Sequence, residues 1–213
     1  MKTDLSSIKN IIFDLGNVIV DLDFDATINA FLKLGLNKAV LNNQQVYSHP
    51  MFYAFEVGNI SPEAFRNTVR EILKNTEATD RQINDAWCAM LLNTTAERIK
   101  LLKKLGRKYR IFLFSNTNVI HINDFLHRFT EKYHFDFTSL FEKTFYSHEI
   151  HERKPDLSAF NKVIEMAGVI PEETLFVDDL KKNIEGARAA KLNAFWLKDG
   201  MELCNCFDIK ALQ

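Results

Sequence analysis

Polar side chains that could do chemistry stand directly after short apolar runs of this sequence. Asp14 follows one run, Ser115 and Asn116 follow a second, and Asp178-Asp179 ends a third. Such runs are typical of buried parallel strands, whose carboxyl ends meet at the sheet edge where open α/β folds bind ligands. We therefore expect these groups to share one crevice, although Asp14 alone could also be a turn aspartate of a hairpin.

Three carboxylates in one crevice need a compensating cation, because like charges a few ångströms apart raise each other's pKa. The set offers oxygen ligands and no His or Cys, which favours Mg²⁺. Lys154, on a loop beside Pro155, could add a positive charge at the same edge or could be an ordinary solvated lysine. For Asp178-Asp179 the alternative is helix capping, for which one aspartate is enough.

A phosphate monoester is a substrate that such a crevice could attack. Asp14 could attack phosphorus once a metal ion and an ammonium group screen the charge on the phosphoryl oxygens. The product would be an aspartyl-phosphate that water later hydrolyses. In this interpretation the Ser115 hydroxyl and nearby amides hold phosphate oxygens, and Lys154 neutralises them.

The elements that must position these groups alternate between apolar runs and amphipathic segments. We expect strands at residues 11–13, 110–114, 144–146, 174–177 and 193–197, with helices at 157–167 and 181–191. This alternation predicts a parallel, three-layer α/β sheet with right-handed crossovers.

Between about residues 21 and 107 there is no convincing buried strand. Helical patterns lie near 24–34, 46–57, 62–74, 80–92 and 95–105. Ser61-Pro62-Glu63 is a strong helix start, because serine can cap free amides, proline suits the first helical position and glutamate complements the positive helix end. We expect most of this block to be a helical insertion.

Composition and charge bound the class of protein. With 27 basic and 28 acidic residues among 213, the charge gives no sign of the basic face of nucleic-acid binders. Cys88, Cys204 and Cys206 show no disulfide spacing, which fits a reducing compartment. No segment has the pattern of a signal peptide or a membrane span. We expect a cytoplasmic monomer without nucleic-acid or membrane partners.

Four segments, in their order and spacing, resemble the four motifs of the haloacid dehalogenase superfamily. They are Phe13-Asp-Leu-Gly-Asn-Val18, Phe114-Ser-Asn116, Arg153-Lys-Pro-Asp156 and Phe176-Val-Asp-Asp179. The resemblance covers about residues 8–20 and 107–200. It implies a Rossmann-like catalytic core, residues 1–20 and 107–213, with an all-helical cap, residues 21–106, inserted after the first motif.

The same resemblance implies a role for each matching residue. Asp14 is implied to be the nucleophile, with Lys154 balancing charge. Of the two later aspartates, Asp179 aligns best with the acidic metal ligand and Asp178 is its near neighbour. The groups implied for phosphate binding are Ser115, Asn116 and Lys154, and those for Mg²⁺ are Asp14, the backbone carbonyl of Gly16, Asp178 and Asp179.

One position departs from the family pattern. Most phosphatases of the superfamily carry an aspartate two residues after the nucleophile as general acid and base, and here that residue is Gly16. Protonating the leaving oxygen normally contributes about 10²- to 10⁴-fold to the rate. The site should therefore be slow, use another donor or prefer a good leaving group. Asp21 and Asp23 are the nearest carboxylates in sequence, and neither is a strong candidate.

Two further segments, Asp14-Leu-Gly-Asn-Val-Ile-Val-Asp21 and Ser115-Asn-Thr-Asn118 with His121 nearby, are similar to a subgroup that includes bacterial α-D-glucose-1-phosphate phosphatases. Those enzymes share the glycine, and a sugar 1-phosphate leaves more readily than a simple alkoxide. Their cap carries a turn that faces the substrate, matched here by Glu56-Val-Gly-Asn-Ile-Ser61. Glu56 is thereby implied to bind substrate.

Three functions are open on this sequence. The first is a Mg²⁺-dependent phosphatase of a small phosphorylated metabolite, such as a sugar phosphate. The second is a 2-haloacid dehalogenase, which would share the nucleophile but need no metal; relatives of that kind lack the Asp178-Asp179 pair, which argues against it. The third is a noncatalytic protein that binds a phosphorylated metabolite, an alternative that Gly16 keeps open.

Overall fold

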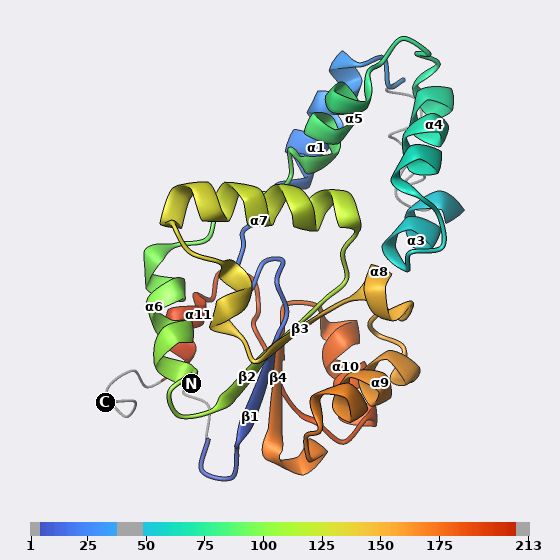
Figure 1. Cartoon of the computed structure of the whole chain (residues 1–213). Coiled ribbons are helices and arrows are strands. Elements are labelled where there is room, and N and C mark those ends of the chain that lie inside the picture. Colours follow the sequence, from blue (N-terminus) through green and yellow to red (C-terminus); the bar gives the residue numbers. More distant parts are fainter. Residues whose placement is uncertain (1–4, 38–48, 208–213) are drawn as a thin grey trace.

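A parallel sheet forms the centre of the computed structural model, which describes residues 5–37 and 49–207. The strands are β1 (Asn10–Phe13), β2 (Arg110–Ser115), β3 (Lys143–Tyr146), β4 (Thr174–Asp178) and β5 (Asn193–Trp196). They form a five-stranded sheet in the order β3-β2-β1-β4-β5, with every neighbouring pair parallel (Figure 1). The expected parallel α/β sheet is confirmed, and each strand boundary lies within one residue of its predicted position.

Helices cover both faces of this sheet. They are α6 (Ala96–Leu105), α7 (Val119–Tyr133), α9 (Leu157–Ala167), α10 (Lys181–Ala189) and α11 (Leu203–Cys206), with the short turns η1 (Phe137–Leu140), α8 (Ser147–Ile150) and η2 (Pro171–Glu173). On β1, Ile11 and Phe13 pack in a cluster with α6, α7 and α11, and Ile12 packs in the opposite cluster with α9 and α10. Burial on both sides explains why the strand is a continuous apolar run.

A second group of helices stands apart from the sheet, above α7 and α8 in Figure 1. These are α1 (Phe24–Lys33), α3 (Pro50–Glu56), α4 (Pro62–Leu73) and α5 (Asp80–Cys88). They share a separate apolar cluster that includes Phe55, Phe65 and Trp87. The Ser61 hydroxyl accepts a hydrogen bond from the Ala64 N–H at 3.1 Å, so the predicted start of α4 is confirmed. The helix expected at 46–57 is α3, and the first expected residues, 46–48, lie outside the described part of the chain.

The helix α6 packs with the core rather than with the cap helices. It buries Ile99, Leu102 and Leu105 in the cluster that covers β1. The division into a core of residues 1–20 and 107–213 and a cap of residues 21–106 stays a prediction. From this packing we propose that the cap ends before α6. Two linkers then join cap and core, one near Asp21 and one near Leu92, and the Leu92 N–H donates to the Asp21 carbonyl at 3.0 Å.

Within residues 5–37 and 49–207, the helices are too short or too polar for a membrane span. The cysteines Cys88, Cys204 and Cys206 are free thiols.

Candidate active site

Asp14 follows β1 at the carboxyl edge of the sheet. Its N–H donates to the Val177 carbonyl at 2.9 Å, which extends the pairing with β4 by one residue. Its Oδ1 accepts a hydrogen bond from the Leu15 N–H and lies beside Lys154 Nζ, both at 2.7 Å. Because β1 is paired in parallel on both sides, Asp14 does not close a hairpin. It is 8% exposed and lies at the bottom of a crevice.

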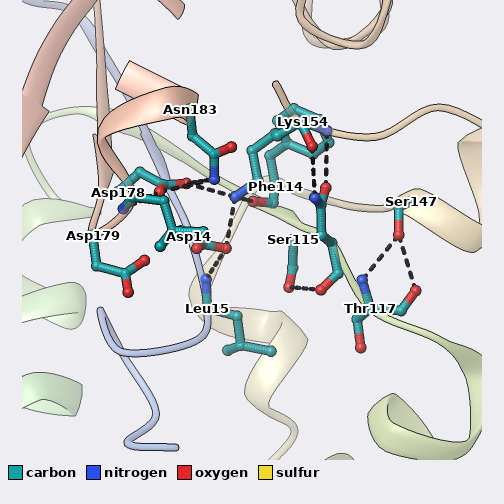
Figure 2. Close-up of polar contacts among 12 residues, drawn as sticks. Asp14, Leu15, Phe114, Ser115, Thr117, Ser147, Lys154, Asp178, Asp179 and Asn183 are labelled. Carbon is teal, nitrogen blue, oxygen red and sulfur yellow. Dashed lines mark hydrogen bonds and ion pairs between the residues drawn. The ribbon is translucent and has the colours of Figure 1, made fainter. Parts of the chain in front are cut away.

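The ammonium group of Lys154 lies between two carboxylates (Figure 2). Its Nζ is 2.7 Å from Asp14 Oδ1 and 2.7 Å from Asp178 Oδ2, and it donates to the Phe114 carbonyl at 2.9 Å. The residue is 1% exposed, so it is not a solvated surface lysine. Burial opposes its positive charge, but Asp14 and Asp178 outweigh that effect and hold the pKa of Lys154 above its usual value.

The two aspartates at the end of β4 differ in how fully they are bonded. Asp178 is 0% exposed. Its Oδ1 accepts from the Leu180 N–H at 2.8 Å, and Asn183 Nδ2 lies 3.0 Å from both of its oxygens. Asp179 lines the crevice, and its Oδ2 accepts from Asn17 Nδ2 at 3.1 Å. Asp178 is thus a fixed anchor, and Asp179 is the carboxylate with more room for a ligand.

Asp14, Asp178 and Asp179 place one carboxylate oxygen each within 4.8 Å of one another. Burial raises the pKa of Asp14 to about 8; Lys154 opposes this, and the charges of Asp178 and Asp179 add to it. Burial also raises the pKa of Asp179. One ammonium group among three carboxylates leaves an excess of negative charge, which a divalent cation would correct. The donors are all oxygen atoms, so the residues present fit Mg²⁺.

Two of the residues predicted to bind phosphate, Ser115 and Asn116, stand at the end of β2. Ser115 is 3% exposed and lines the crevice. The side chain of Asn116 is taken up by the main chain of Lys154: Nδ2 donates to its carbonyl and Oδ1 accepts from its N–H, both at 2.9 Å. The Asn116 side chain therefore positions the lysine, and its backbone amide is the group that remains for a phosphate.

Gly16 belongs to a tight turn in which the Asn17 N–H donates to the Val20 carbonyl at 2.7 Å. A Cβ on Gly16 would lie 2.7 Å from Leu22 Cδ1, so Leu22 occupies the space that a larger side chain would need. The acid usual at this position is absent from the sequence, and a side chain there would need the flexible end of Leu22 to shift. That the Gly16 carbonyl ligates a metal stays a prediction.

A cavity of about 500 Å³ lies between the strand ends and the cap helices. Its lining includes Asp14, Ser115 and Asp179 from the core and Glu56 and Trp87 from the cap. A concave, largely apolar lining with a few polar groups is typical of small-molecule sites. The carboxylate of Asp14 thus faces a substrate-sized space.

Glu56 stands at the end of α3 and reaches the core across this cavity. Its Oε2 lies 2.5 Å from Arg153 Nη1, and both residues line the cavity. The Arg153 guanidinium also lies 5.4 Å from the centroid of the Tyr53 ring. Burial raises the pKa of Glu56 above its usual value, although the charges of Arg153 and Lys154 oppose the shift. That Glu56 binds substrate stays a prediction.

The structure adds residues to which the sequence assigned no role. Asn183 clamps Asp178 from the first turn of α10, and its position five residues after Asp178, in a predicted helix, was a usable signal. Arg153 belongs to one of the four family motifs, but its ion pair with Glu56 was not predicted. The Ser147 hydroxyl lies 2.6 Å from the Glu56 carbonyl oxygen, and no signal could have found it because 91 positions separate the two residues.

Comparison with known proteins agrees with this geometry. The family model of haloacid dehalogenase-like hydrolases matches residues 8–191. A D-ribitol-5-phosphate phosphatase of Bacteroides thetaiotaomicron is 29% identical over 195 residues, which are 92% of this chain and 94% of the relative. A sesquiterpene phosphatase of Aspergillus oryzae is 27% identical over 204 residues, 93% of this chain and 94% of the relative.

A solved structure shows the same architecture. It is a family enzyme from Bacteroides thetaiotaomicron in complex with magnesium and inorganic phosphate, at a TM-score of 0.83 and 32% identity. The match covers 94% of this chain and 100% of that chain. The expected Rossmann-like α/β fold is therefore confirmed.

Proposed function

Because this chain belongs to the haloacid dehalogenase-like hydrolases, we propose that it is a Mg²⁺-dependent phosphatase of a small phosphorylated metabolite, acting through an aspartyl-phosphate on Asp14. The observation that carries this proposal is the group of Asp14, Lys154 and Asp179 at one end of a substrate-sized cavity, with the first two buried and Asp179 half-buried. Two relatives named as phosphatases support it, as does the similar structure that holds magnesium and phosphate.

The proposed reaction has two displacements at phosphorus. In the first, an oxygen of Asp14 forms a bond to phosphorus, the bond from phosphorus to the leaving oxygen breaks, and an alcohol departs. In the second, water attacks the aspartyl-phosphate, inorganic phosphate leaves and the carboxylate is restored. Lys154, 2.7 Å from Asp14 Oδ1, holds the attacking group and supplies positive charge beside it.

The metal and phosphate subsites follow the same geometry. Asp14 and Asp179, with the backbone carbonyl of Gly16, would hold Mg²⁺, and Asp178 would fix the arrangement beside them. When bound, the ion supplies charge compensation to the carboxylates and to phosphoryl oxygens. The Ser115 hydroxyl and the backbone amides that follow it would hold the remaining phosphate oxygens.

For the substrate we propose a sugar phosphate, such as glucose 1-phosphate. The segments around Asp14 and Glu56 favour this class, and the relative named as a D-ribitol-5-phosphate phosphatase has a substrate with a polyol as its leaving group. Glu56 and Arg153 on the cavity wall are polar groups that could bind hydroxyls. The dehalogenase alternative leaves the cluster of three carboxylates without a role, and the noncatalytic alternative rests on Gly16 alone.

A phosphate-release screen over phosphorylated sugars, sugar alcohols and nucleotides tests the proposal. We expect release that needs Mg²⁺, is abolished by EDTA and falls at least about 10⁴-fold in Asp14→Asn, the scale of losing a catalytic nucleophile or its partner. The matched control is Asp199→Asn, which removes an exposed carboxylate and should keep full activity. Equal release by the unchanged protein and Asp14→Asn would exclude Asp14 as nucleophile, and binding without release would favour the noncatalytic alternative.

A further inference from the structure

Gly16 leaves the proposed phosphatase without the usual acid and base beside its nucleophile. We propose that Glu56, on the cap side of the cavity, is the catalytic residue that takes over this role. The inference rests on the proposed function, because a proton donor matters only if a leaving oxygen departs from phosphorus. It gives Glu56 a chemical step, whereas the resemblance implied only contact with the substrate.

The other carboxylates near the nucleophile in sequence are engaged elsewhere. Asp21 Oδ1 lies 2.7 Å from Arg98 Nη1. Asp23 Oδ1 caps α1 by accepting from the Ala26 N–H at 3.2 Å. Neither aspartate is among the described residues that line the cavity. Neither aspartate is therefore placed to protonate a leaving oxygen in the cavity.

The two histidines of the cavity are less well placed for this role than Glu56. His121 Nε2 donates to the Trp87 carbonyl at 3.0 Å, and Nδ1 accepts from the Asn118 amide at 3.2 Å. Burial lowers the pKa of His121 to about 4, so the ring is neutral near pH 7 and its one N–H is already bonded. His49 uses Nδ1 to cap α3 by accepting from the Met51 N–H at 3.2 Å, and it stands at the start of that helix, whereas Glu56 stands at its end beside the contacts to Ser147 and Arg153. Among the described carboxyl groups of the cavity lining, Glu56 is the one that comes from the cap side.

The turn that carries Glu56 is fastened to the core. The Ser147 hydroxyl lies 2.6 Å from the Glu56 carbonyl oxygen, and His151 Nδ1 donates to the carbonyl of the next residue at 2.9 Å. A Cβ on Gly58 would lie 2.2 Å from the His148 carbonyl oxygen, and its φ is 73°, so the close approach requires glycine. These contacts hold the Glu56 backbone in a fixed place relative to the strand ends.

The surroundings of the Glu56 carboxyl suit a group that gives and takes a proton. Arg153 Nη1 lies 2.5 Å from Oε2, which leaves Oε1 to carry the proton. Burial raises the pKa of Glu56, so it keeps its proton to higher pH than an exposed glutamate does. Arg153, Lys154 and Lys182 oppose that shift, and their charges stabilise the carboxylate once the proton has left. A general acid works best with its pKa near the working pH.

The proton moves in both displacements. As the bond from Asp14 to phosphorus forms and the bond to the leaving oxygen breaks, the proton of Glu56 passes to that oxygen and a neutral alcohol departs. The Glu56 carboxylate then takes a proton from the attacking water, whose oxygen bonds to phosphorus as the bond to Asp14 breaks. Inorganic phosphate leaves, and Glu56 is again an acid.

The test compares Glu56→Gln with the unchanged protein on p-nitrophenyl phosphate and on an alkyl phosphate. Nitrophenolate leaves without a proton, so the variant should release a rapid burst of about one equivalent per site and then turn over slowly, because the base of the second displacement is lost. With the alkyl ester there should be no burst, and kcat should fall about 10²- to 10⁴-fold while KM changes less than about three-fold. The burst also shows that the variant is folded.

Glu149→Gln, which alters an exposed carboxylate of α8 near the same turn, is the matched control and should keep both rates. Equal losses on both esters without a burst, a loss confined to KM, or no loss on the alkyl ester would each overturn the role of Glu56. The proposed function fails separately, if the unchanged protein releases phosphate from neither ester or if Glu56→Gln still shows the burst after Asp14→Asn is added to it.

Discussion

Two buried cations of this protein have the same kinds of partner in different surroundings. Each meets two carboxylates and one main-chain carbonyl: Asp14, Asp178 and the Phe114 carbonyl for Lys154, and Asp21, Glu202 and the Ile19 carbonyl for Arg98. Lys154 is 1% exposed and Arg98 is 7% exposed. The kinds of partner match, although Arg98 binds Glu202 through two nitrogens, and the clearest remaining difference is in the surroundings of the partners.

The carboxylate partners differ in their access to water. The side chains of Asp14 and Asp178 are 11% and 0% exposed, whereas those of Asp21 and Glu202 are 49% and 41% exposed. Water screens the second pair strongly and the first pair little. The contacts of Lys154 therefore form a buried charge cluster that a metal ion can complete. The contacts of Arg98 form a partly exposed ion-pair network that joins separate segments of the chain, called here the Arg98 tie.

The tie made by Arg98 lies where the cap joins the core. Its partner Asp21 belongs to the first linker, and the Asp21 carbonyl accepts from the Leu92 N–H of the second linker at 3.0 Å. The neighbouring Asp23 N–H donates to the Met90 carbonyl at 2.9 Å. Arg98 therefore acts on how the cap is held, whereas Lys154 acts on the reacting groups.

Replacing each cation by methionine should separate these roles most strongly. Lys154→Met leaves buried carboxylates without their partner, and we expect it to lower the free energy of unfolding by about 3–5 kcal/mol and to abolish phosphate release. Arg98→Met should lower it by about 1–2 kcal/mol, since water can solvate the exposed sides of its partners, and should leave release measurable. Urea unfolding in EDTA measures the free energy of unfolding of each variant. Equal losses of stability would mean that the burial of the partners is irrelevant.

Mg²⁺ should stabilise the cluster around Lys154, and the gain should not depend on Arg98. A ligand at 100 times its dissociation constant adds about 2.7 kcal/mol to the free energy of unfolding, and we expect this gain in the unchanged protein and in Arg98→Met. Asp179→Asn removes one carboxylate of the cluster and should reduce the gain to less than about 1 kcal/mol. Urea unfolding across a titration of Mg²⁺ is the measurement. A full gain in Asp179→Asn would place the ion at another site.

The same contrast explains what could be predicted from the sequence. Asp14 and Asp178-Asp179 each follow an apolar run, and neighbouring parallel strands bring such ends together, so the strands and the cluster at their ends were predictable. Lys154 stands on a loop rather than at a strand end. Its position beside Pro155 left open both a place at the site and a solvated surface lysine, and the resemblance to the family motifs favoured the first, since a lysine in a polar loop has no local mark of burial.

Contacts that join distant segments were not predictable. Arg98 and Glu202 are 104 positions apart, and nothing local marks either residue. Asn116 was expected to bind phosphate, and that stays a prediction for its backbone amide. Its side chain bonds the main chain of Lys154, 38 positions later, because the chain returns to the end of β2 after α7, β3 and α8. The C-terminal boundary of the cap could not be predicted for a similar reason. The amphipathic pattern of α6 does not show whether the helix packs in the apolar cluster of the cap or in that of the core.

Acid and salt should each remove the small contribution that the Arg98–Glu202 pair makes to the free energy of unfolding. The hydrogen bond from Arg98 lowers the pKa of Glu202 below its ordinary value of 4.5, so the pair stabilises the fold above that pH and loses its contribution as pH falls through the lowered pKa. With the Glu202 side chain 41% exposed, the contribution after screening is at most about 1 kcal/mol. Urea unfolding of Glu202→Gln and of the unchanged protein should differ by that amount at about pH 7 and converge near pH 3.

Salt tests the same ion pair in a second way. The difference between Glu202→Gln and the unchanged protein should also vanish in about 1 M NaCl, where the Debye length is about 3 Å, while the loss of stability caused by Lys154→Met persists because little solvent reaches its partners. A Glu202→Gln difference that survived the salt would show the tie to be as shielded as the cluster, and the distinction drawn from burial would be wrong.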